Sequence, residues 1–182
     1  MRVPALGLSV AVVLFVADQL VKWIVTGPLG IAALGDYHTI LPIFDLRFVP
    51  NVGVSRGLFA ATSDATRWLL VAFTGAIAAG VLVWLWREPA KADQAALGLV
   101  LGGALGNILD RVRLGYVVDY ADLHFSTPWD PEWRPFLVFN VADAAITLGV
   151  LILLARALFT RDKPAAPAAK SDTAPVSEEV NA

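Results

Sequence analysis

Residues 68–86, WLLVAFTGAIAAGVLVWLW, form a run of 19 residues without a charged side chain. A helix rises about 1.5 Å per residue, so this run covers nearly all of a hydrocarbon core roughly 30 Å thick. Three other segments have comparable length and polarity: residues 4–25, 94–112 and 135–155. The sequence therefore predicts an all-α integral membrane protein with four transmembrane helices.

The composition agrees with this class. The chain has 182 residues, of which 57% are hydrophobic and 16% charged, whereas soluble domains average about 45–50% apolar and about 25% charged residues. The formal net charge of -2 gives no reason to expect nucleic acid as a partner. The chain contains no cysteine, which excludes disulfides, iron–sulfur clusters and thiol catalysis, and its two histidines are too few for a histidine-rich metal site. We expect neither a metal nor a cofactor.

Two outer loops connect the predicted spans. Residues 26–66 contain a β-like stretch, 37–49, whose alternation and aromatic content favour short strands with a break at Pro42. We therefore expect a small β-containing loop domain between the first and second helices. The second outer loop, residues 113–134, carries two tryptophans suited to a membrane interface.

The two ends of the chain differ in character. Residues 160–182 are rich in Ala, Pro, Lys, Ser and Glu, and we predict that they form a disordered tail after a membrane domain of residues 1–159. Arg2 and the apolar run after it fit the outline of a cleaved signal peptide. The cleavage pattern is unconvincing, however, and residues 18–22 continue the helical pattern, so we predict a retained first helix.

Four spans place both termini on the same side of the membrane, and basic residues normally favour the cytoplasmic side. Here the count is tied at seven of the fourteen basic residues on each side. With cytoplasmic termini, the inner set would be Arg2, Arg87, Lys91, Arg156, Arg161, Lys163 and Lys170. Charge alone therefore determines the topology only weakly.

Ionisable groups inside spans are costly and mark candidate functional sites. Asp18 and Lys22 lie four residues apart on one helix face, with the acid first, so they can neutralise each other. We favour a structural pair over direct chemistry at these two positions. The third span carries small residues at GxxxG spacing, which predicts close helix packing; these are Gly98, Gly102 and Gly106.

Polar residues continue at the ends of the third and fourth spans. Asn107 and Arg111 are four residues apart, and Arg111 needs a carboxylate or carbonyl partner at the membrane edge. Either it anchors the helix at the interface or it orients nearby carboxylates. In the fourth span, Asn140, Asp143 and Thr147 form one polar stripe. No basic residue in that span can neutralise Asp143, which favours a functional role.

Asp119 follows the third span, beyond a turn that Gly115 permits. If the third and fourth spans are antiparallel neighbours, Asp119 and Asp143 could meet near the outer surface. Two adjacent carboxylates share a proton, so one can activate water while the other protonates. The alternative is that Asp119 is an ordinary loop carboxylate, like Asp122. Serine catalysis is disfavoured because the outer serines lack a serine–histidine motif.

Five blocks of sequence occur in a recognisable order: DQLVK (18–22), NVGVS (51–55), GGALGNILDR (102–111), GYVVDY (115–120) and FNVAD (139–143). Together with the four spans, they resemble the lipoprotein signal peptidases, or signal peptidase II, which are aspartic peptidases of the bacterial inner membrane. The resemblance extends over about residues 5–159. One departure is Arg56, which stands where the family usually has an aromatic residue.

The resemblance implies a catalytic dyad of Asp119 and Asp143. It also implies a set of residues that bind substrate or support the site: Asn51, Gly53, Asn107, Arg111, Asn140, Asp18 and Lys22. The implied reaction removes signal peptides from diacylglyceryl-modified prolipoproteins, just before the lipid-modified cysteine. The implied topology has cytoplasmic termini and an active site near the periplasmic face of the inner membrane. We also expect contact with membrane phospholipids and a monomeric protein.

Two other classes of function remain open from the residues alone. A small proton-coupled transporter could use Asp18, Lys22, Asp119 and Asp143 as a relay, although such proteins usually have more spans or an inverted repeat. A dimeric membrane scaffold could use the GxxxG face. The scaffold leaves the polar stripe of the fourth span unexplained.

Overall fold

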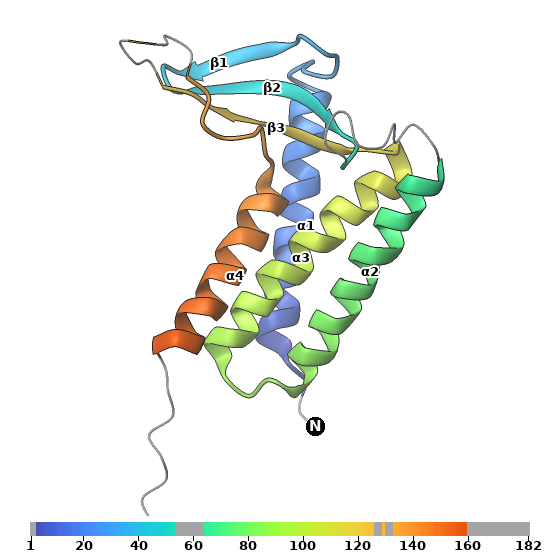
Figure 1. Ribbon diagram of the computed structural model, residues 1–182, viewed down its shortest axis with the longest axis vertical. Helices are drawn as coiled ribbons and strands as arrows, with labels where there is room; N and C mark the ends of the chain where they lie inside the picture. Colours follow the sequence, from blue (N-terminus) through green and yellow to red (C-terminus); the bar gives the residue numbers. More distant parts are fainter. Residues whose placement is uncertain (1–2, 54–63, 126–128, 130–132, 160–182) are drawn as a thin grey trace, which may run out of the picture.

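The computed structural model describes residues 3–53, 64–125, 129 and 133–159. Four helices and a three-stranded antiparallel sheet form the molecule, as the sequence predicted for its class (Figure 1). The elements are α1 Ala5–Thr26, β1 Tyr37–Leu41, β2 Phe44–Asn51, α2 Asp64–Arg87, α3 Lys91–Leu114, β3 Val117–Leu123 and α4 Val141–Phe159. Arg56, the outer serines Ser55 and Ser63, and the tail 160–182 lie outside the described residues.

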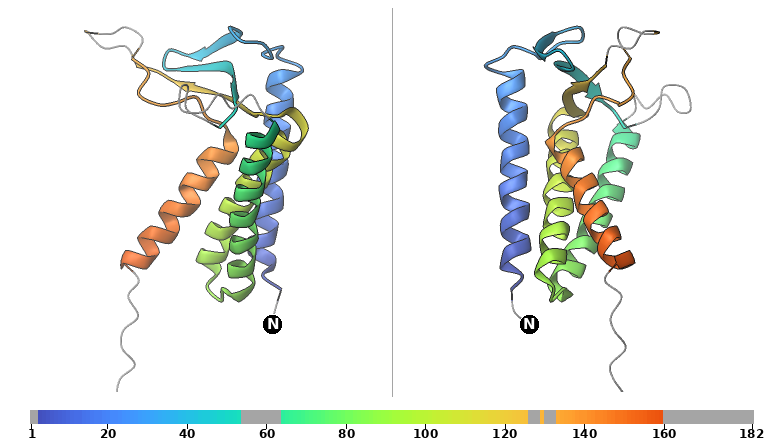
Figure 2. Two further views of the ribbon diagram at one scale, coloured as in Figure 1. Left: turned by 45° about the vertical axis from the view of Figure 1, so that its right-hand side comes forward. Right: turned by 90° about the vertical axis from the view of Figure 1, so that its left-hand side faces the viewer.

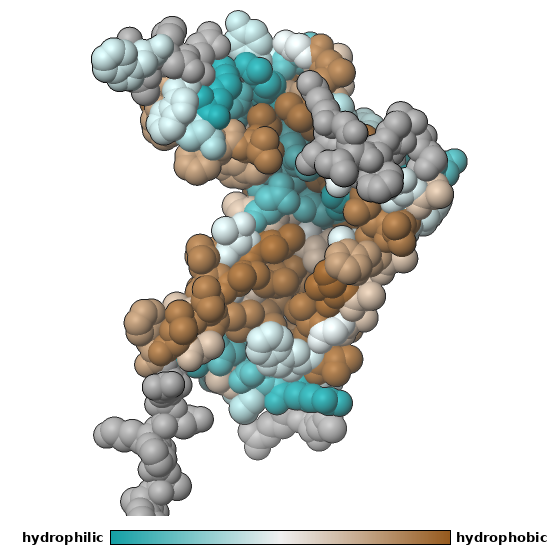
Figure 3. Space-filling view, in the orientation of Figure 1, coloured by the Kyte–Doolittle hydropathy of each residue, from teal (hydrophilic) through white to brown (hydrophobic). Residues whose placement is uncertain are grey.

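The helices form a bundle with the sheet across one end (Figures 1 and 2). Each of the four is long and apolar enough to cross a membrane. The central helix is α3, which packs against all three of the others. Hydrophobic residues cover the sides of the bundle, while hydrophilic residues gather at its two ends (Figure 3). The start of α1 and the end of α4 both lie at the end remote from the sheet.

The glycines of α3 allow close contact with α1. A Cβ atom at Gly102 would lie 2.5 Å from the carbonyl oxygen of Ala11, and one at Gly106 would lie 2.5 Å from Asp18 Oδ2. A Cβ atom at Gly98 would meet the carbonyl oxygen of Gly7. The predicted GxxxG face is therefore occupied within the chain, which removes the surface that a dimeric scaffold would need.

The sheet has the order β1-β2-β3. The β-like stretch 37–49 forms β1 and most of β2, with a turn at Pro42. β3 was not predicted: it lies in the region that the sequence suggested was an outer loop. Six of its seven residues are buried, so the strand lacks the alternation that signals a half-exposed strand.

The fourth helix begins at Val141, six residues after the predicted start of the span at residue 135. Just before it, Phe139 and Ala121 exchange backbone hydrogen bonds of 3.0 and 2.8 Å. Because the backbone N–H and C=O of Phe139 are bonded to β3, α4 can begin only after this residue. The strand–helix junction thus brings the start of α4 directly beside β3.

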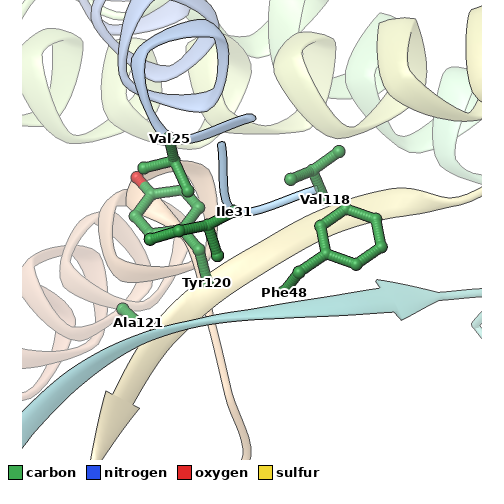
Figure 4. Close-up of a cluster of buried hydrophobic side chains, with 6 residues drawn as sticks. All are labelled: Val25, Ile31, Phe48, Val118, Tyr120 and Ala121. Carbon is green, nitrogen blue, oxygen red and sulfur yellow. The ribbon is translucent and has the colours of Figure 1, made fainter. Parts of the chain in front are cut away.

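A hydrophobic cluster fastens the sheet to the bundle (Figure 4). Tyr120 and Ala121 of β3 pack against Val25 at the end of α1, together with Ile31, Phe48 and Val118. All six side chains are buried. Burial of this cluster holds β3 at a defined height above the helices.

Candidate active site

The residues that the sequence singled out converge beneath the sheet. Asp119 lies on β3, Asp143 in the first turn of α4, and Asn51 at the end of β2. Asn107 and Arg111 lie in the last turns of α3. The structure therefore brings together groups from four elements that are far apart in the chain.

Asp119 is 2% exposed, and side-chain amides hold both of its oxygens. Asn140 Nδ2 donates to Oδ1 at 2.7 Å, and Asn51 Nδ2 donates to Oδ2 at 2.9 Å. Burial raises the pKa of the Asp119 carboxyl to about 6. This value already includes the two amide hydrogen bonds, which lower the pKa, and the charge of Asp143, which raises it. Asp119 is therefore a carboxyl group that can gain or lose a proton near neutral pH.

Asp143 is half-buried and belongs to the N-terminal cap of α4. Its backbone N–H donates to Asn140 Oδ1 at 2.9 Å, and its Oδ2 accepts from the backbone N–H of Asn140 at 3.3 Å. This reciprocal pattern is a capping box. Asn107 Nδ2 donates to the other oxygen, Oδ1, at 2.8 Å. The polar stripe of the fourth span thus has a structural role as well as a place beside Asp119.

Asn140 bridges the two aspartates. Its amide nitrogen donates to Asp119 and, at 3.2 Å, to Asn107 Oδ1, while its amide oxygen accepts from the backbone N–H of Asp143. Its side chain is almost fully buried. One amide therefore fixes the relative position of a strand carboxylate and a helix carboxylate.

A buried ion cluster lies beneath this pair. Lys22 Nζ lies 2.8 Å from Asp18 Oδ2 and 2.7 Å from Asp110 Oδ2, and it donates to Asn107 Oδ1 at 3.2 Å. All four side chains are buried. Asp110 is the member that the sequence reasoning missed as a partner of Lys22. The sequence shows that Asp110 is next to Arg111, but it does not show that the Asp110 side chain points toward Lys22 of α1.

The two acids of this cluster also accept hydrogen bonds from the backbone beside each aspartate of the site. Asp18 Oδ1 accepts from the N–H of Ala142 at 3.0 Å, one residue before Asp143. Asp110 Oδ2 accepts from the N–H of Val118 at 3.2 Å, one residue before Asp119. Lys22 joins the two acids, so the ion cluster fixes both strand and helix beneath the site.

Arg111 lies at the edge of the site without a carboxylate at ion-pair distance among the described residues. Its Nη1 donates to the carbonyl of Asn107 at 3.4 Å, so the predicted carbonyl partner is present. A Cβ atom at Gly53 would lie 3.5 Å from Arg111 Nη2, and Gly53 has a φ of +81°. The left-handed backbone favours glycine there.

Arg67, at the start of α2, was also missed by the sequence reasoning. Its Nε donates to the carbonyl of Arg111 at 2.7 Å, and its Nη2 donates to the carbonyl of Val112. These carbonyls belong to the last turn of α3, where that of Arg111 also accepts from the backbone N–H of Gly115 at 3.1 Å. Arg67 therefore stabilises the end of the helix that carries Asn107 and Arg111.

The sheet contains a second charged cluster. Asp45 and Asp122 face each other across β2 and β3, and both are buried. Arg134, from the segment before α4, forms ion pairs with both acids. His124 Nε2 lies 3.2 Å from Asp45 Oδ2. Arg47 Nε lies 3.2 Å from Asp122 Oδ2.

A cavity of about 350 Å³ opens beside Asp143. Apolar side chains form most of its lining, including Phe136, Phe139, Leu148 and Leu151. It follows the outward side of α4 from the carboxylate toward the middle of the helix. The site therefore combines a pair of carboxylates with an apolar groove. Within the described ranges, no group of three or more His, Cys, Asp or Glu side chains is placed to hold a metal ion.

Four membrane-length helices lie under a small sheet, and the Asn140 side chain joins the Asp119 carboxylate to the backbone of Asp143. These features define a helical membrane protein with a carboxylate site. Residues 10–159 match the family model described as signal peptidase (SPase) II. The chain therefore belongs to the signal peptidase II family, whose members are proteases.

Known relatives agree with this assignment. A lipoprotein signal peptidase of Rhizorhabdus wittichii is 55% identical over 167 residues, which cover 92% of this chain and 93% of the relative. One from Sphingopyxis alaskensis is 54% identical, with 86% and 87% covered. Two solved bacterial membrane enzyme structures, each 25% identical, superpose with TM-scores of 0.70 and 0.68. They cover 85% and 84% of this chain, and 94% and 87% of their own.

Proposed function

We propose that this chain is an aspartic endopeptidase that removes signal peptides from diacylglyceryl-modified prolipoproteins, just before the lipid-modified cysteine. The observation that carries the proposal is the bridge through Asn140, which joins Asp119 of β3 to Asp143 of α4. One carboxyl is buried and has a raised pKa, and the other is half-buried beside an apolar groove. Such an asymmetric pair suits acid–base hydrolysis of a peptide bond.

The proposed reaction begins with Asp119 protonated and Asp143 ionised. Asp143 takes a proton from water as the water oxygen attacks the scissile carbonyl carbon, and Asp119 gives its proton to the carbonyl oxygen. In the resulting tetrahedral intermediate, Asp143 passes its proton to the leaving nitrogen as the C–N bond breaks. Asp119 recovers its proton from the collapsing hydroxyl group. Each carboxyl thus returns to its starting state.

The groove along α4 supports the proposal that the substrate is lipid-modified. Its apolar lining surrounds Asp143 and continues along α4 to Leu151, so acyl chains can stay in hydrocarbon while the scissile bond reaches the carboxylates. We assign the sheet end of the bundle to the periplasmic face of the inner membrane and both termini to the cytoplasm. We also propose a monomer, because the GxxxG face of α3 is already covered by α1.

A proton-coupled transporter has less support. Such a relay would need titratable groups along the path across the membrane. Among the described residues, the buried polar and charged side chains are Asp18, Lys22, Asp45, Asn107, Asp110, Asp119, Asp122 and Asn140. All belong to the sheet or to the half of the bundle nearest it. The cluster is thus a site at one face of the membrane.

A cleavage assay tests the proposal. One prolipoprotein, with or without its diacylglyceryl group, is incubated in nanodiscs with wild type, Asp119→Asn or Asp143→Asn, and cleavage is followed by gel shift. The matched control is Asp64→Asn, since the Asp64 side chain is 90% exposed. We expect cleavage of only the lipidated substrate, lost in both site variants and kept in the control. Near-full cleavage by folded Asp143→Asn would overturn the mechanism.

A further inference from the structure

A second cavity lies at the end of the bundle remote from the aspartates. It has a volume of about 720 Å³ and forms where α1 begins and α2 turns into α3. Val3, Leu6, Trp86 and Pro89 give it an apolar wall. Its charged lining is two cations, Arg87 and Lys91, and one acid, Glu88. Hydrophilic residues lie at this end of the molecule, below the hydrophobic sides of the bundle (Figure 3). The cavity thus lies at the boundary between hydrocarbon and water.

The two cations form no ion pair with the part of the chain that the structure describes. Arg87 and Lys91 are both exposed, and neither forms a hydrogen bond or ion pair with another described residue. The neighbouring acids are engaged elsewhere. Glu88 accepts from Trp84 Nε1 at 3.2 Å and from the backbone N–H of Ala90 at 3.0 Å.

Asp93, the other acid at this end, is also satisfied. Arg156 of α4 donates to both of its carboxylate oxygens, one of them at 3.2 Å. This pair ties α4 to α3, and the charge of Arg156 balances that of Asp93. Two cations and the carboxylate of Glu88 leave the described lining of the cavity with one net positive charge.

We propose that this cavity binds an anionic phospholipid. The phosphate lies between Arg87 and Lys91, and an acyl chain follows Val3, Leu6 and Trp86 into the bilayer. Basic pockets between membrane helices bind anionic headgroups in this way. The combination of an apolar wall with unpaired cations fits an amphiphile that carries net negative charge, while a zwitterionic lipid would leave one positive charge uncompensated. The site is separate from the carboxylate pair, and its assignment does not depend on the peptidase reaction.

Native mass spectrometry of the full chain tests this site. Detergent-solubilised protein is mixed with phosphatidylglycerol or phosphatidylcholine of identical acyl chains, and retained lipid is counted. A basic residue near a lipid surface contributes a factor of about five in affinity, so Arg87→Gln/Lys91→Gln should weaken phosphatidylglycerol binding roughly 30-fold. The control is Arg113→Gln, which removes an exposed cation at the opposite end of the bundle.

We expect wild type and Arg113→Gln to retain phosphatidylglycerol in preference to phosphatidylcholine, and the double variant to lose that preference while keeping the same Tm in lipid-free detergent. Equal retention of both lipids by wild type would overturn the proposal. An equal loss in Arg113→Gln would do the same, because it would show a general charge effect. Displacement of the bound lipid by an equal concentration of glycerol phosphate would assign the cations to a soluble anion instead.

Discussion

The ammonium of Lys22 lies 2.7 Å from Asp110 Oδ2, and this ion pair connects α1 to the end of α3 beneath the site. Asp18 lies on the other side of the same ammonium, at 2.8 Å. The two acids hold the backbone one residue before Asp143 and one residue before Asp119. The three charged side chains thus support the positions of both aspartates through the backbone beside each of them.

Removal of the central cation should therefore be severe. Lys22→Met leaves Asp18 and Asp110 buried without their cation, and breaking a buried ion pair costs about 3–5 kcal/mol. We expect a large fall in Tm in detergent together with loss of cleavage. Lys91→Met, the same change at an exposed site, should leave Tm within a few degrees. An unchanged Tm for Lys22→Met would contradict this account of the cluster.

The raised pKa of Asp119 predicts a pH-dependent stability. In the folded state the Asp119 carboxyl has a pKa of about 6, whereas its ordinary value is 3.8. Between these two pH values, the folded state keeps a proton that the unfolded state has lost. Stability therefore falls as the pH rises from about 4 to about 6, and it stays low above that. Asp119→Asn removes the ionisation and should be more stable than wild type at pH 8, by up to about 3 kcal/mol.

Denaturation at pH 4 and pH 8 measures this difference. The advantage of Asp119→Asn should shrink toward zero at pH 4, where the wild-type carboxyl is protonated in both states. Asp64→Asn provides the exposed control and should show no comparable change. A constant difference across this range would mean that Asp119 titrates at its ordinary pKa.

Asn140 has two roles that a pair of variants can separate. Asn140→Ala removes both the cap of α4 and the bridge, so it should cost about 1 kcal/mol of stability and reduce kcat by roughly 100-fold. Asn140→Ser keeps a capping oxygen but cannot reach Asp119 and Asn107 together. Serine should therefore restore Tm while kcat stays low. Recovery of both quantities would show that the bridge has no part in catalysis.

Arg67 is expected to act as a positioning residue. Arg67→Gln loses the cation that holds two carbonyls at the end of α3, which should lower kcat several-fold with a smaller effect on KM. Arg67→Lys keeps the charge but offers a single donor group, so it should recover part of the loss. Equal changes in kcat for Lys and Gln would show that geometry, and not charge, is decisive. A change in Tm alone would argue against any positioning role.

The cluster on the sheet predicts a rescue experiment. Arg134→Gln leaves Asp122 with Arg47 as its remaining cation and should cost about 2 kcal/mol. Removing the acid as well, in Asp122→Asn/Arg134→Gln, should restore part of the lost stability because Asp122 is then neutral, while Asp45 keeps His124 as its partner. Thermal unfolding of the two single variants and the double variant completes the cycle. A double variant less stable than Arg134→Gln would contradict this explanation.

The lowered pKa of Asp45 makes the contribution of the same cluster to stability depend on pH. Burial raises this pKa, but the hydrogen bond from Thr39 and the contact with His124 more than offset it, so the pKa of Asp45 falls below its ordinary value. A carboxylate with a lowered pKa stabilises the fold above about pH 4, and that contribution is lost as the pH falls. Asp45→Asn should therefore be less stable than wild type at pH 7 and closer to it at pH 3, as thermal unfolding can measure.

Local sequence features determined the class of the protein. The length and polarity of residues 68–86 indicate a membrane span, and the spacing of the glycines of α3 indicates close packing. The pair of Asp18 and Lys22 follows from one helical turn, because a spacing of four residues places both side chains on the same face. Each of these features depends on neighbours within a few residues, so the sequence alone reveals it.

Only the tertiary structure decided how the site is built. β3 is buried on both faces and lacks a periodic signal, so neither the strand nor the location of Asp119 on it was evident. Asp110 meets Lys22 across 88 positions of sequence, and Arg67 meets Arg111 across 44. Contacts at such separations depend on how helices rotate and pack against one another. The sequence thus determined four spans and a set of costly polar groups, while packing decided which of those groups meet beneath the sheet and which hold the others in place.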